Sequence, residues 1–331
     1  MEENVKKKSF KDTLGVITGQ PWFSGLVPLF IIMTVASIVS PAFLTQDNLI
    51  DMARTASYSF CVAAPFTFLM TTGGIDLSMG AMTSLGGVVC GKALLTGMGI
   101  VPALLCAVLV GCLVGIVKSL LIVDLGLPGF IATLGLQYII NGAILVWTEG
   151  INVTGLPLEF KALGQGSLIP GTRFYNTIAI AIVIAIVFWF LLEKTKFGRC
   201  VCAVGGNQET ARIAGIRTRV YIYTCHMMVS AFAGIAGSLY ASRFSSAITT
   251  MGTGTEMNII SAVVIGGTSM GGGFGTLIGT VFGSYLFACI TNALVLMHVS
   301  VYWQNLVYGV ILIIAIIIDK YRRAATAGAN A

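Results

Sequence analysis

The chain has 331 residues, of which 56% are apolar and only 10% are charged, whereas a soluble domain carries about 25% charged residues. So few charges cannot cover the surface of a water-soluble protein of this length, and the composition therefore predicts an integral membrane protein. The net charge of +6 would suit nucleic acid, but the basic residues lie in short clusters between apolar runs, so we expect no nucleic-acid partner.

Long apolar stretches follow one another along almost the whole chain. A hydrocarbon core about 30 Å thick needs roughly 20 mostly apolar residues per helix. The stretches that meet or approach this length are residues 22–40, 49–70, 78–96, 100–123, 128–147, 174–192, 220–242, 258–268, 275–297 and 301–318. We therefore expect an all-α polytopic membrane protein with about ten transmembrane helices, whose transmembrane domain covers residues 22–318.

Short segments flank this domain at both ends. Residues 1–21 contain a lysine cluster, which together with the first apolar stretch could form a cleavable signal peptide. That stretch is longer than a typical signal-peptide core and lacks a small-residue cleavage site, so we expect an uncleaved first span. Residues 319–331 form a tail that ends in alanine, glycine and asparagine.

The lysines and arginines indicate the orientation of the predicted spans. With the N-terminus inside, 14 of the 19 basic residues fall on the inner side, among them Lys118. The five on the outer side are Arg54, Lys92, Lys161, Arg173 and Arg243. Because positive residues favour cytoplasmic loops, this bias places both termini in the cytoplasm.

Ionisable and amide side chains are rare within the spans. Lys92 and Lys118 are expected to snorkel toward the membrane surface, as long basic side chains do. Four amides are expected to form hydrogen bonds between helices, namely Gln137, Asn141, Asn292 and Gln304. The two histidines, His226 and His298, are too isolated to form a metal site or a proton relay.

Asp76 stands just before the third predicted span. An ionisable side chain in or near an apolar span is costly and usually faces a pathway or a partner. The alternative is an N-cap at the membrane surface, where the carboxylate satisfies free N–H groups of the helix. We favour the cap and keep a gating role open. Glu256, before the eighth span, is interpreted in the same way.

The longest and most charged inner segment covers residues 193–219. Within it, residues 208–213 can form a short helix, with Asn207 as the N-cap and Glu209 in the first turn. Gly215 suits the end of that helix. The alternative interpretation is a solvated loop whose positive charges only set the orientation of the protein.

The eighth predicted span is too short to cross a membrane as a regular helix, so we expect it to be broken or partly re-entrant. The glycine-rich residues 266–273 that overlap its end cannot stay helical at low cost, which predicts a tight turn at the inner face. The run resembles a phosphate loop, but no GK[ST] ending follows, so nucleotide binding by this chain is not expected.

The two halves of the chain share a pattern. Residues 76–87 and residues 256–267 each begin with a carboxylate and end in a pair of glycines. Matching glycines also lie in the fourth and ninth spans, at Gly111 and Gly115 and at Gly279 and Gly283. Each match joins spans that are five apart, which indicates an inverted internal repeat. These glycines could instead serve only to pack helices together, and we expect both interpretations to hold.

Three stretches carry a family pattern. Residues 73–80 read GGIDLSMG and are similar to a family signature, GGIDLSVG. Residues 204–216 read VGGNQETARIAGI and are similar to a cytoplasmic loop of the same family. Residues 261–275 read SAVVIGGTSMGGGFG and are similar to a third signature, AAVVIGGTSLxGGxG. The chain thereby resembles the permease subunits of ribose- and xylose-type sugar ABC importers, the binding-protein-dependent transport inner membrane component family. One departure is Asn258, which retains hydrogen bonding but lacks the charge of the acid common there.

The resemblance implies a transport subunit without catalytic residues, cofactor or metal, in the bacterial cytoplasmic (inner) membrane. Its implied partners are an ABC ATPase subunit with two nucleotide sites, an extracytoplasmic sugar-binding protein and a second permease copy or paralogue, in addition to membrane lipid. The ATPase would hydrolyse ATP to drive import of a monosaccharide, a ribose-like pentose or a hexose.

The resemblance also implies that the inner loop 193–219 carries a coupling helix that docks in a groove of the ATPase. The candidate coupling residues are Gly206, Asn207, Glu209, Ala211, Arg212 and Gly215. The candidates for the translocation path or its gate are Gly73, Gly74, Asp76, Ser78, Glu256, Asn258, Gly266, Gly267 and Thr268.

Other functions stay open at this point. The cargo could be another small polar solute, such as a polyol or a sugar-like signalling molecule. An ion-coupled secondary transporter would need several ionisable groups within its spans, and a membrane enzyme would need carboxylates or histidines clustered near one face; the chain has few of either. A branched-chain amino-acid permease fits the stretch 73–78 less well than a sugar permease does.

Overall fold

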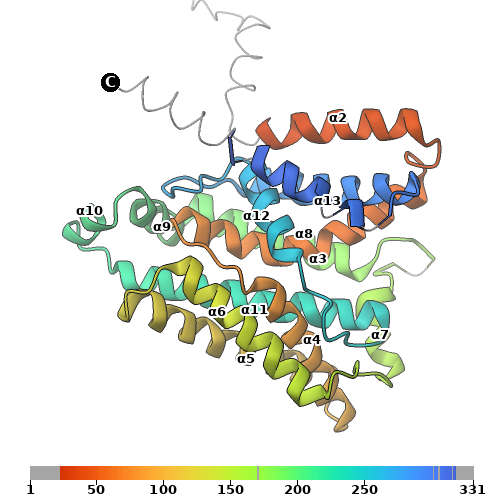
Figure 1. Ribbon diagram of the computed structural model, residues 1–331, viewed down its shortest axis with the longest axis horizontal. Coiled ribbons are helices and arrows are strands. Elements are labelled where there is room, and N and C mark those ends of the chain that lie inside the picture. Colours follow the sequence, from red (N-terminus) through yellow and green to blue (C-terminus); the bar gives the residue numbers. More distant parts are fainter. Residues whose placement is uncertain (1–22, 170, 301, 305, 315, 318–331) are drawn as a thin grey trace, which may run out of the picture.

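The computed structural model describes residues 23–169, 171–300, 302–304, 306–314 and 316–317, and over these residues the fold is a bundle of helices (Figure 1). In chain order the elements are α2 (Phe23–Val39), α3 (Gln46–Thr71), α4 (Met79–Leu95), α5 (Ile100–Ser119), the π-helical turn η1 (Leu120–Asp124), α6 (Gly129–Thr148), α7 (Leu158–Gln165), α8 (Asn176–Lys194), α9 (Lys196–Gly206), α10 (Gln208–Ile213), α11 (Thr218–Phe244), α12 (Thr255–Ile265) and α13 (Leu277–Leu296). A last apolar helical segment covers Tyr302–Ile314.

A helix lies at each of the ten predicted spans, although the boundaries differ by several residues. Within the described ranges, five helices are long and apolar enough to cross a membrane, namely α5 with η1, α6, α8, α11 and α13. Helix α3 has 26 residues but carries Asp47, Asp51 and Arg54 in its first turns. The expected terminal segments, 1–21 and 319–331, lie outside the described residues.

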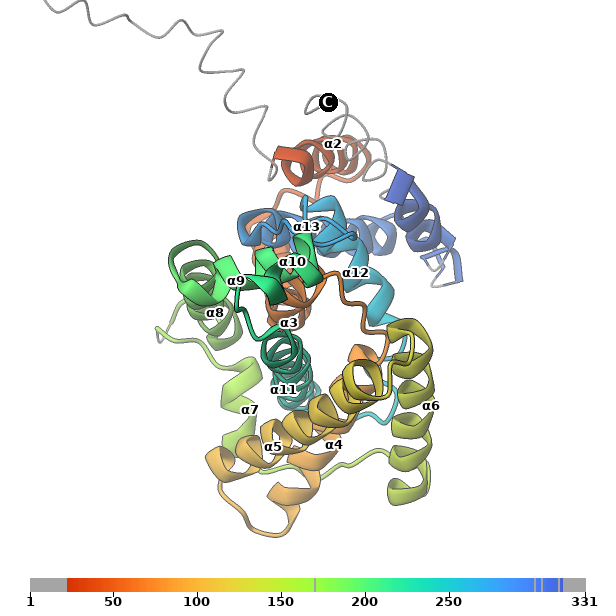
Figure 2. The same cartoon turned by 90° about the vertical axis from the view of Figure 1, so that its left-hand side faces the viewer.

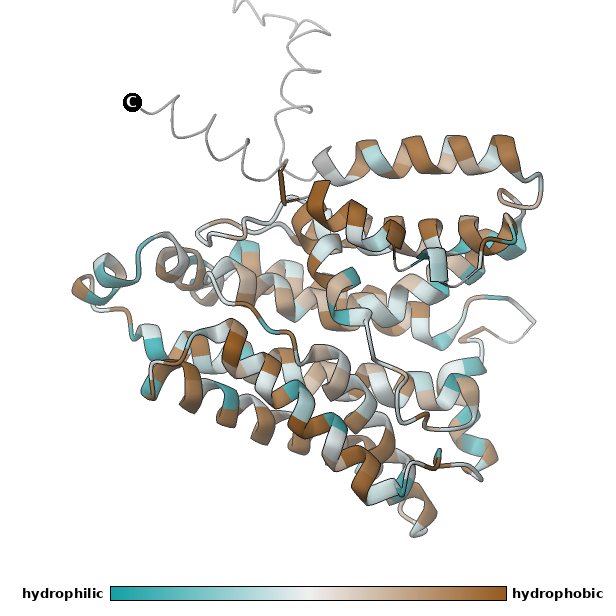
Figure 3. Cartoon of the chain, in the orientation of Figure 1, coloured by the Kyte–Doolittle hydropathy of each residue, from teal (hydrophilic) through white to brown (hydrophobic). Residues whose placement is uncertain are grey.

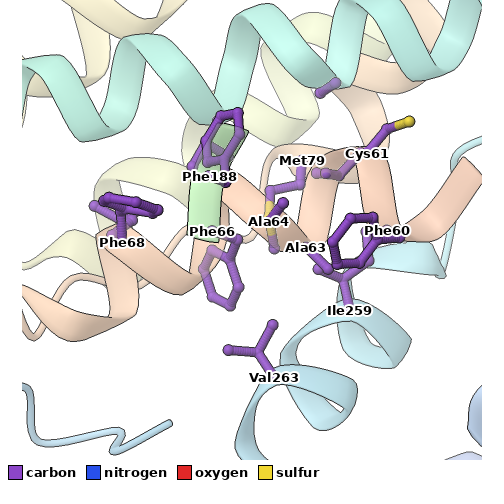
Figure 4. Close-up of a cluster of buried hydrophobic side chains, with 14 of the residues drawn as sticks. Phe60, Cys61, Ala63, Ala64, Phe66, Phe68, Met79, Phe188, Ile259 and Val263 are labelled. Atoms are coloured by element: carbon purple, nitrogen blue, oxygen red, sulfur yellow. The ribbon is translucent and has the colours of Figure 1, made fainter. Parts of the chain in front are cut away.

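Helices α3 and α11 lie side by side in the middle of the bundle, as the end-on view shows (Figure 2). Helix α11 packs against α3, α4 and α5, and α3 packs against α8, α12 and α13. The largest buried apolar cluster surrounds α3, where Phe60 and Phe66 lie near Ile259 and Val263 of α12 (Figure 4). These two central helices hold the elements of the candidate site in place.

The outer helices are rich in apolar residues (Figure 3), and many of these side chains are exposed. In α5, Leu105, Leu109 and Leu113 recur at every fourth residue and are each more than half exposed. On the opposite face of the same helix, Ala107 and Gly111 are buried. A helix with a small-residue face inward and a leucine face outward suits a bundle that is surrounded by lipid.

Glycines bring helices of the core into backbone contact, as the packing interpretation predicts. A side chain at Gly86 of α4 would collide with the backbone of Gly234 in α11. A side chain at Gly111 of α5 would lie 2.5 Å from the carbonyl oxygen of Ser230, also in α11, and one at Gly283 of α13 would collide with α12. Close packing is therefore confirmed, although the glycines matched between the two halves contact different helices.

Helices α4 and α12 begin inside the bundle, and we call them the half-helices. Figure 1 shows the chain returning from the end of α3 before α4 begins near the middle of the bundle. With 17 and 11 residues, they are about 25 and 16 Å long, shorter than a hydrocarbon core of about 30 Å. Their N-terminal turns meet, because a side chain at Gly80 would collide with Gly252 and Glu256. The short eighth helix is thus confirmed, whereas the expectation that the third span starts at the membrane surface is wrong.

Candidate translocation and coupling site

The short helix predicted within the inner loop is present as α10. Asn207 caps it, because its Oδ1 accepts a hydrogen bond of 2.9 Å from the Thr210 N–H. Gly215 follows the helix with a φ of +83°, and its N–H donates to the Arg212 carbonyl oxygen at 3.0 Å, as in a Schellman ending. Both ends of α10 are therefore fixed by residues of the loop itself.

Helix α10 projects from one end of the bundle (Figure 1), and most of its side chains are exposed. Glu209 and Arg212 lie one turn apart and form an ion pair of 2.7 Å. The hydrogen bond and the charge of Arg212 lower the pKa of the Glu209 carboxyl below its ordinary value, so both groups are charged at neutral pH. Ile213 beside them is 78% exposed, whereas Ala211 is buried. Charges around an exposed apolar side chain suit a docking surface.

The end of α9 is in backbone contact with two other loops. A side chain at Gly205 would collide with the Thr71 carbonyl oxygen and would lie 2.6 Å from the nitrogen of Gly273, whose N–H donates to Thr71 at 2.9 Å. Gly272, with a φ of +81°, lies beside the carbonyl oxygen of Gly205 and the nitrogen of Gly73. We call this contact between residues 71–74, 205–206 and 271–275 the glycine junction.

Helix α3 ends at the glycine junction. Gly73 has a φ of +82° and donates its N–H to the Met70 carbonyl oxygen at 2.8 Å, while the Gly74 N–H donates to Leu69 at 3.0 Å. This Schellman ending sets the direction in which the chain returns toward α4. The three sequence stretches that carry the family pattern thus meet at one place, although they are distant in sequence.

Asp76 lies on the returning segment and is fully buried. Its Oδ1 accepts hydrogen bonds from the N–H and the Oγ of Ser78 at 2.8 and 2.7 Å. Ser78 is the N-cap of α4 and, in the described part of the chain, no side chain accepts from the first turn, so the expectation that Asp76 caps this helix is wrong. The Oδ2 of Asp76 pairs with Lys118 Nζ at 2.7 Å, and Nζ also donates to Ser230 Oγ at 2.8 Å. Because Ser230 lies midway along the 27-residue α11, the ion pair is deep in the bundle and not at the membrane surface.

The structure contradicts the expectation that Lys118 snorkels. Its side chain is fully buried, because a carboxylate within reach is a better partner for the ammonium group than water farther away. Lys118 therefore does not count among the positive residues that set the orientation. His226, one turn before Ser230 on α11, is also buried and lies within electrostatic range of Asp76.

Glu256 occupies the first turn of α12 and is 6% exposed. Its Oε1 accepts a hydrogen bond of 3.2 Å from Gln137 of α6, which confirms the interhelical bond predicted for that amide. Its Oε2 lies against Gly80 in the first turn of α4 and has no hydrogen-bond partner within the described ranges. A carboxylate near two helix N-termini is stabilised by both dipoles. Glu256 therefore lies where the first turns of the two half-helices meet.

The remaining candidates follow Glu256 along the chain. The Oδ1 of Asn258 is buried without a partner among the residues that the structure describes. Gly266 packs against α13, Gly267 has a φ of +103°, and Thr268 Oγ1 accepts a hydrogen bond of 3.2 Å from the Thr276 N–H. The predicted turn after α12 is therefore present, and it leads to the glycine junction.

The candidates thus fall into two groups. Gly206 lies in the glycine junction with Gly73 and Gly74, and the other coupling residues follow it on or beside α10. Asp76, Ser78 and Glu256 lie in the interior, where the half-helices begin. The structure does not bring the two groups into direct contact, but the segment of residues 74–78 connects them.

Sequence reasoning missed that Asp76 pairs with Lys118 and that Lys118 also donates to Ser230. The lysine is 42 residues from the aspartate and 112 residues from the serine, so no local pattern links them. A signal was present nevertheless, because a lone aspartate and a lone lysine in apolar surroundings each need a partner. Pairing the few charges of the spans with one another would have found the contact.

A bundle of apolar helices, with two half-helices inside and a charged helix at one end, defines a membrane transport subunit. The family model described as branched-chain amino acid transport system / permease component matches residues 48–316. The chain belongs to this family of ABC-transporter permease components, which are multi-pass membrane proteins and are not themselves catalytic.

Relatives with known names cover nearly the whole chain. The chain is 36% identical over 302 residues to the ribose import permease protein RbsC of Bacillus subtilis (strain 168), and the aligned region covers 89% of this chain and 92% of the relative. The corresponding protein of Escherichia coli (strain K12) is 29% identical over 320 residues, with 94% and 100% covered. The autoinducer 2 import system permease protein LsrC of Shigella flexneri is 33% identical over 300 residues, with 89% and 87% covered. No solved structure matches the chain.

Proposed function

We propose that this chain is the membrane-spanning permease of an ATP-driven importer of a small sugar in the bacterial inner membrane. It works with a separate ATPase subunit and an extracytoplasmic sugar-binding protein. The glycine junction is the observation that carries the proposal. Its backbone contacts join the end of α9, which leads into the exposed helix α10, to the end of α3, from which the chain runs directly to α4.

In this proposal α10 is the coupling helix. Its caps make it rigid, and its exposed Ile213 and charged Glu209 and Arg212 offer a groove of the ATPase both an apolar and a polar contact. Closure of the ATPase on ATP then moves α10 as a rigid body. Because Gly205 touches Thr71 and Gly273, that movement is transmitted to α3 and to the turn after α12.

The translocation path runs past the start of the half-helices. Transporters often place their substrate path where discontinuous helices begin near the middle of the membrane. Here, two such N-termini meet beside Asp76 and Glu256, and Gln137 and Asn258 add amide groups that can exchange hydrogen bonds with hydroxyl groups. The rest of the surrounding core is mainly apolar.

The cargo we propose is ribose or a related monosaccharide. Two of the relatives are named as ribose import permeases, at 36% and 29% identity. The second candidate is autoinducer 2, because the relative named for its import is 33% identical. Since identity to both is similar, the ligand of the partner binding protein decides between them.

An inverted repeat, cytoplasmic termini and a second permease chain complete the proposal. Helix α3 packs against α13, and α11 packs against α5. In the proposed repeat, α3 corresponds to α11 and α13 corresponds to α5, so the two contacts are equivalent. This correspondence supports a two-fold relation within the chain. A second copy or a paralogue would occupy the second groove of an ATPase that has two nucleotide sites.

Reconstitution of the full transporter in lipid vesicles tests the proposed function. We expect uptake of radiolabelled ribose or autoinducer 2 only when the permease, the ATPase and the loaded binding protein are all present with ATP. An ATPase variant that binds but does not hydrolyse ATP is the control and should abolish uptake. Uptake that persists without the ATPase would contradict the proposal and favour a secondary transporter.

A further inference from the structure

We propose that Lys118 is a positioning residue for transport. Together with Asp76, Ser78 and Ser230 it forms a buried group that we call the clasp. The clasp holds the segment between the glycine junction and α4 so that this segment and α4 move as one piece with α5 and α11. The inference rests on the proposed function, because it states how movement of α10 reaches the half-helices.

The segment of residues 72–78 is held along its whole length. At its start, Gly73 lies against Gly272 in the glycine junction. Further along, the Leu77 N–H donates a hydrogen bond of 3.1 Å to Thr133 Oγ1 of α6. At its end, Asp76 holds Ser78 and Lys118. So short a segment with contacts at both ends cannot absorb a displacement by bending.

The clasp is closed as well as buried. Lys118 Nζ has two acceptors, Asp76 Oδ2 at 2.7 Å and Ser230 Oγ at 2.8 Å, and both charged side chains are fully buried. Oδ1 of Asp76 receives both donors of Ser78. Separating these charges inside the bundle would leave each of them without compensation, which is strongly unfavourable. The clasp therefore stays closed while the elements around it move.

Helix α5 gives the coupling region a second connection to the clasp. Beyond Lys118, the helix continues into η1 and ends at Asp124. Asp124 pairs with Arg219 at 2.5 Å and accepts a hydrogen bond from Tyr223, both in the first turns of α11, directly after α10. Movement of α10 thus reaches Asp76 both through the glycine junction and through α5. The clasp is the place where the two connections meet.

A variant that loses the charges of both Asp76 and Lys118 can show whether the clasp transmits movement or only stabilises the fold. Losing one partner leaves a buried uncompensated charge, so Asp76→Asn and Lys118→Met should each impair assembly. The double variant Asp76→Asn/Lys118→Met removes both charges and keeps the volumes similar, and such replacements of buried ion pairs are often tolerated in folding. Its transport then reports on the clasp and not on stability.

The experiment compares these variants in the reconstituted full transporter, with ribose taken up per ATP hydrolysed as the measurement. We expect the double variant to assemble and hydrolyse ATP, but with an uptake ratio reduced roughly 2- to 30-fold, the range for residues that couple two sites. Ser230→Ala, which removes one hydrogen bond of Lys118, should reduce the ratio in the same direction but less. Lys92→Met, at the other end of α4, is the matched control and should keep the wild-type ratio.

A wild-type ratio in the double variant and in Ser230→Ala would overturn the clasp. If the double variant does not assemble, the Ser230→Ala ratio alone decides the question. A different result would contradict the proposed function, namely that vesicles with the wild-type transporter show no ATP-dependent uptake. The clasp is then judged by a second measurement, the stimulation of ATP hydrolysis by the binding protein, which should fall in the same order among the variants.

Discussion

The closest backbone contact of the glycine junction is at Gly205 and depends on the absence of a side chain there. Gly205 is in contact with the Thr71 carbonyl oxygen on one side and the Gly273 nitrogen on the other, and both belong to backbone that is itself hydrogen-bonded. Backbone cannot move aside as the end of a flexible side chain can. The neighbouring Gly206 has nothing within 4 Å of the position that a side chain would take, so the two glycines form a matched pair.

We predict that Gly205→Ala destabilises the protein by about 1–3 kcal/mol, the usual cost of overpacking, and lowers the amount of ATPase that it binds. Gly206→Ala should leave both properties near wild type. Thermal unfolding in detergent and co-purification with the ATPase measure the two effects. Equal behaviour of the two variants would show that the close contact at Gly205 is not required.

Lys118 shows where reasoning from the sequence fails at the scale of one residue. Its position near the end of an apolar stretch predicts snorkelling, because the side chain is long enough to reach water. The structure instead gives it a buried carboxylate 42 positions earlier in the chain. The partner of a buried charge depends on which helices become neighbours, and hydropathy along the chain does not contain that information.

At the scale of elements, α10 is the opposite case. Asn207, Glu209 and Gly215 predicted its start, its first turn and its end, and all three predictions are confirmed. Capping is decided by residues within one turn of the helix end, so a sequence is sufficient to predict it.

We predict that Gly215→Pro abolishes ATPase binding and leaves membrane insertion intact. Proline cannot adopt the φ of +83° found at Gly215, and it removes the N–H that donates to Arg212. The control is Gly171→Pro, since Gly171 has a φ of +80° and lies before α8, at the opposite end of the bundle. Co-purification of the ATPase at wild-type level with Gly215→Pro would count against α10 as the coupling helix.

Other elements could not be predicted from local pattern. Helix α9 contains Gly198, Gly205 and Gly206, and glycine disfavours a helix when the local sequence is considered alone. Helix α7 has only eight residues and is held in place by Ser242 of α11, whose Oγ accepts a hydrogen bond of 2.7 Å from the Gly164 N–H. The hydropathy of α4 resembles that of a complete span. Its start inside the bundle depends on the return segment and on contact with α12, and both are tertiary features.

At the scale of the whole molecule, the bundle separates three environments. Leucine-rich faces such as that of α5 point outward, small residues and aromatic clusters fill the core, and a buried ion pair, Asp76–Lys118, lies near the start of α4. This arrangement follows from the cost of an uncompensated charge in lipid. The number of helices at the predicted spans could be obtained from hydropathy, but their order around α3 and α11 could not.

The proposed coupling requires α10 to lie in the cytoplasm, where the ATPase can reach it. We would replace the eight native cysteines, introduce either Glu209→Cys or Thr172→Cys, and treat intact cells and inverted membrane vesicles with a membrane-impermeant thiol reagent. We expect Glu209→Cys to react only in inverted vesicles and Thr172→Cys, on the opposite side, to react only in intact cells. Reaction of Glu209→Cys in intact cells would contradict the orientation and, with it, the proposed coupling.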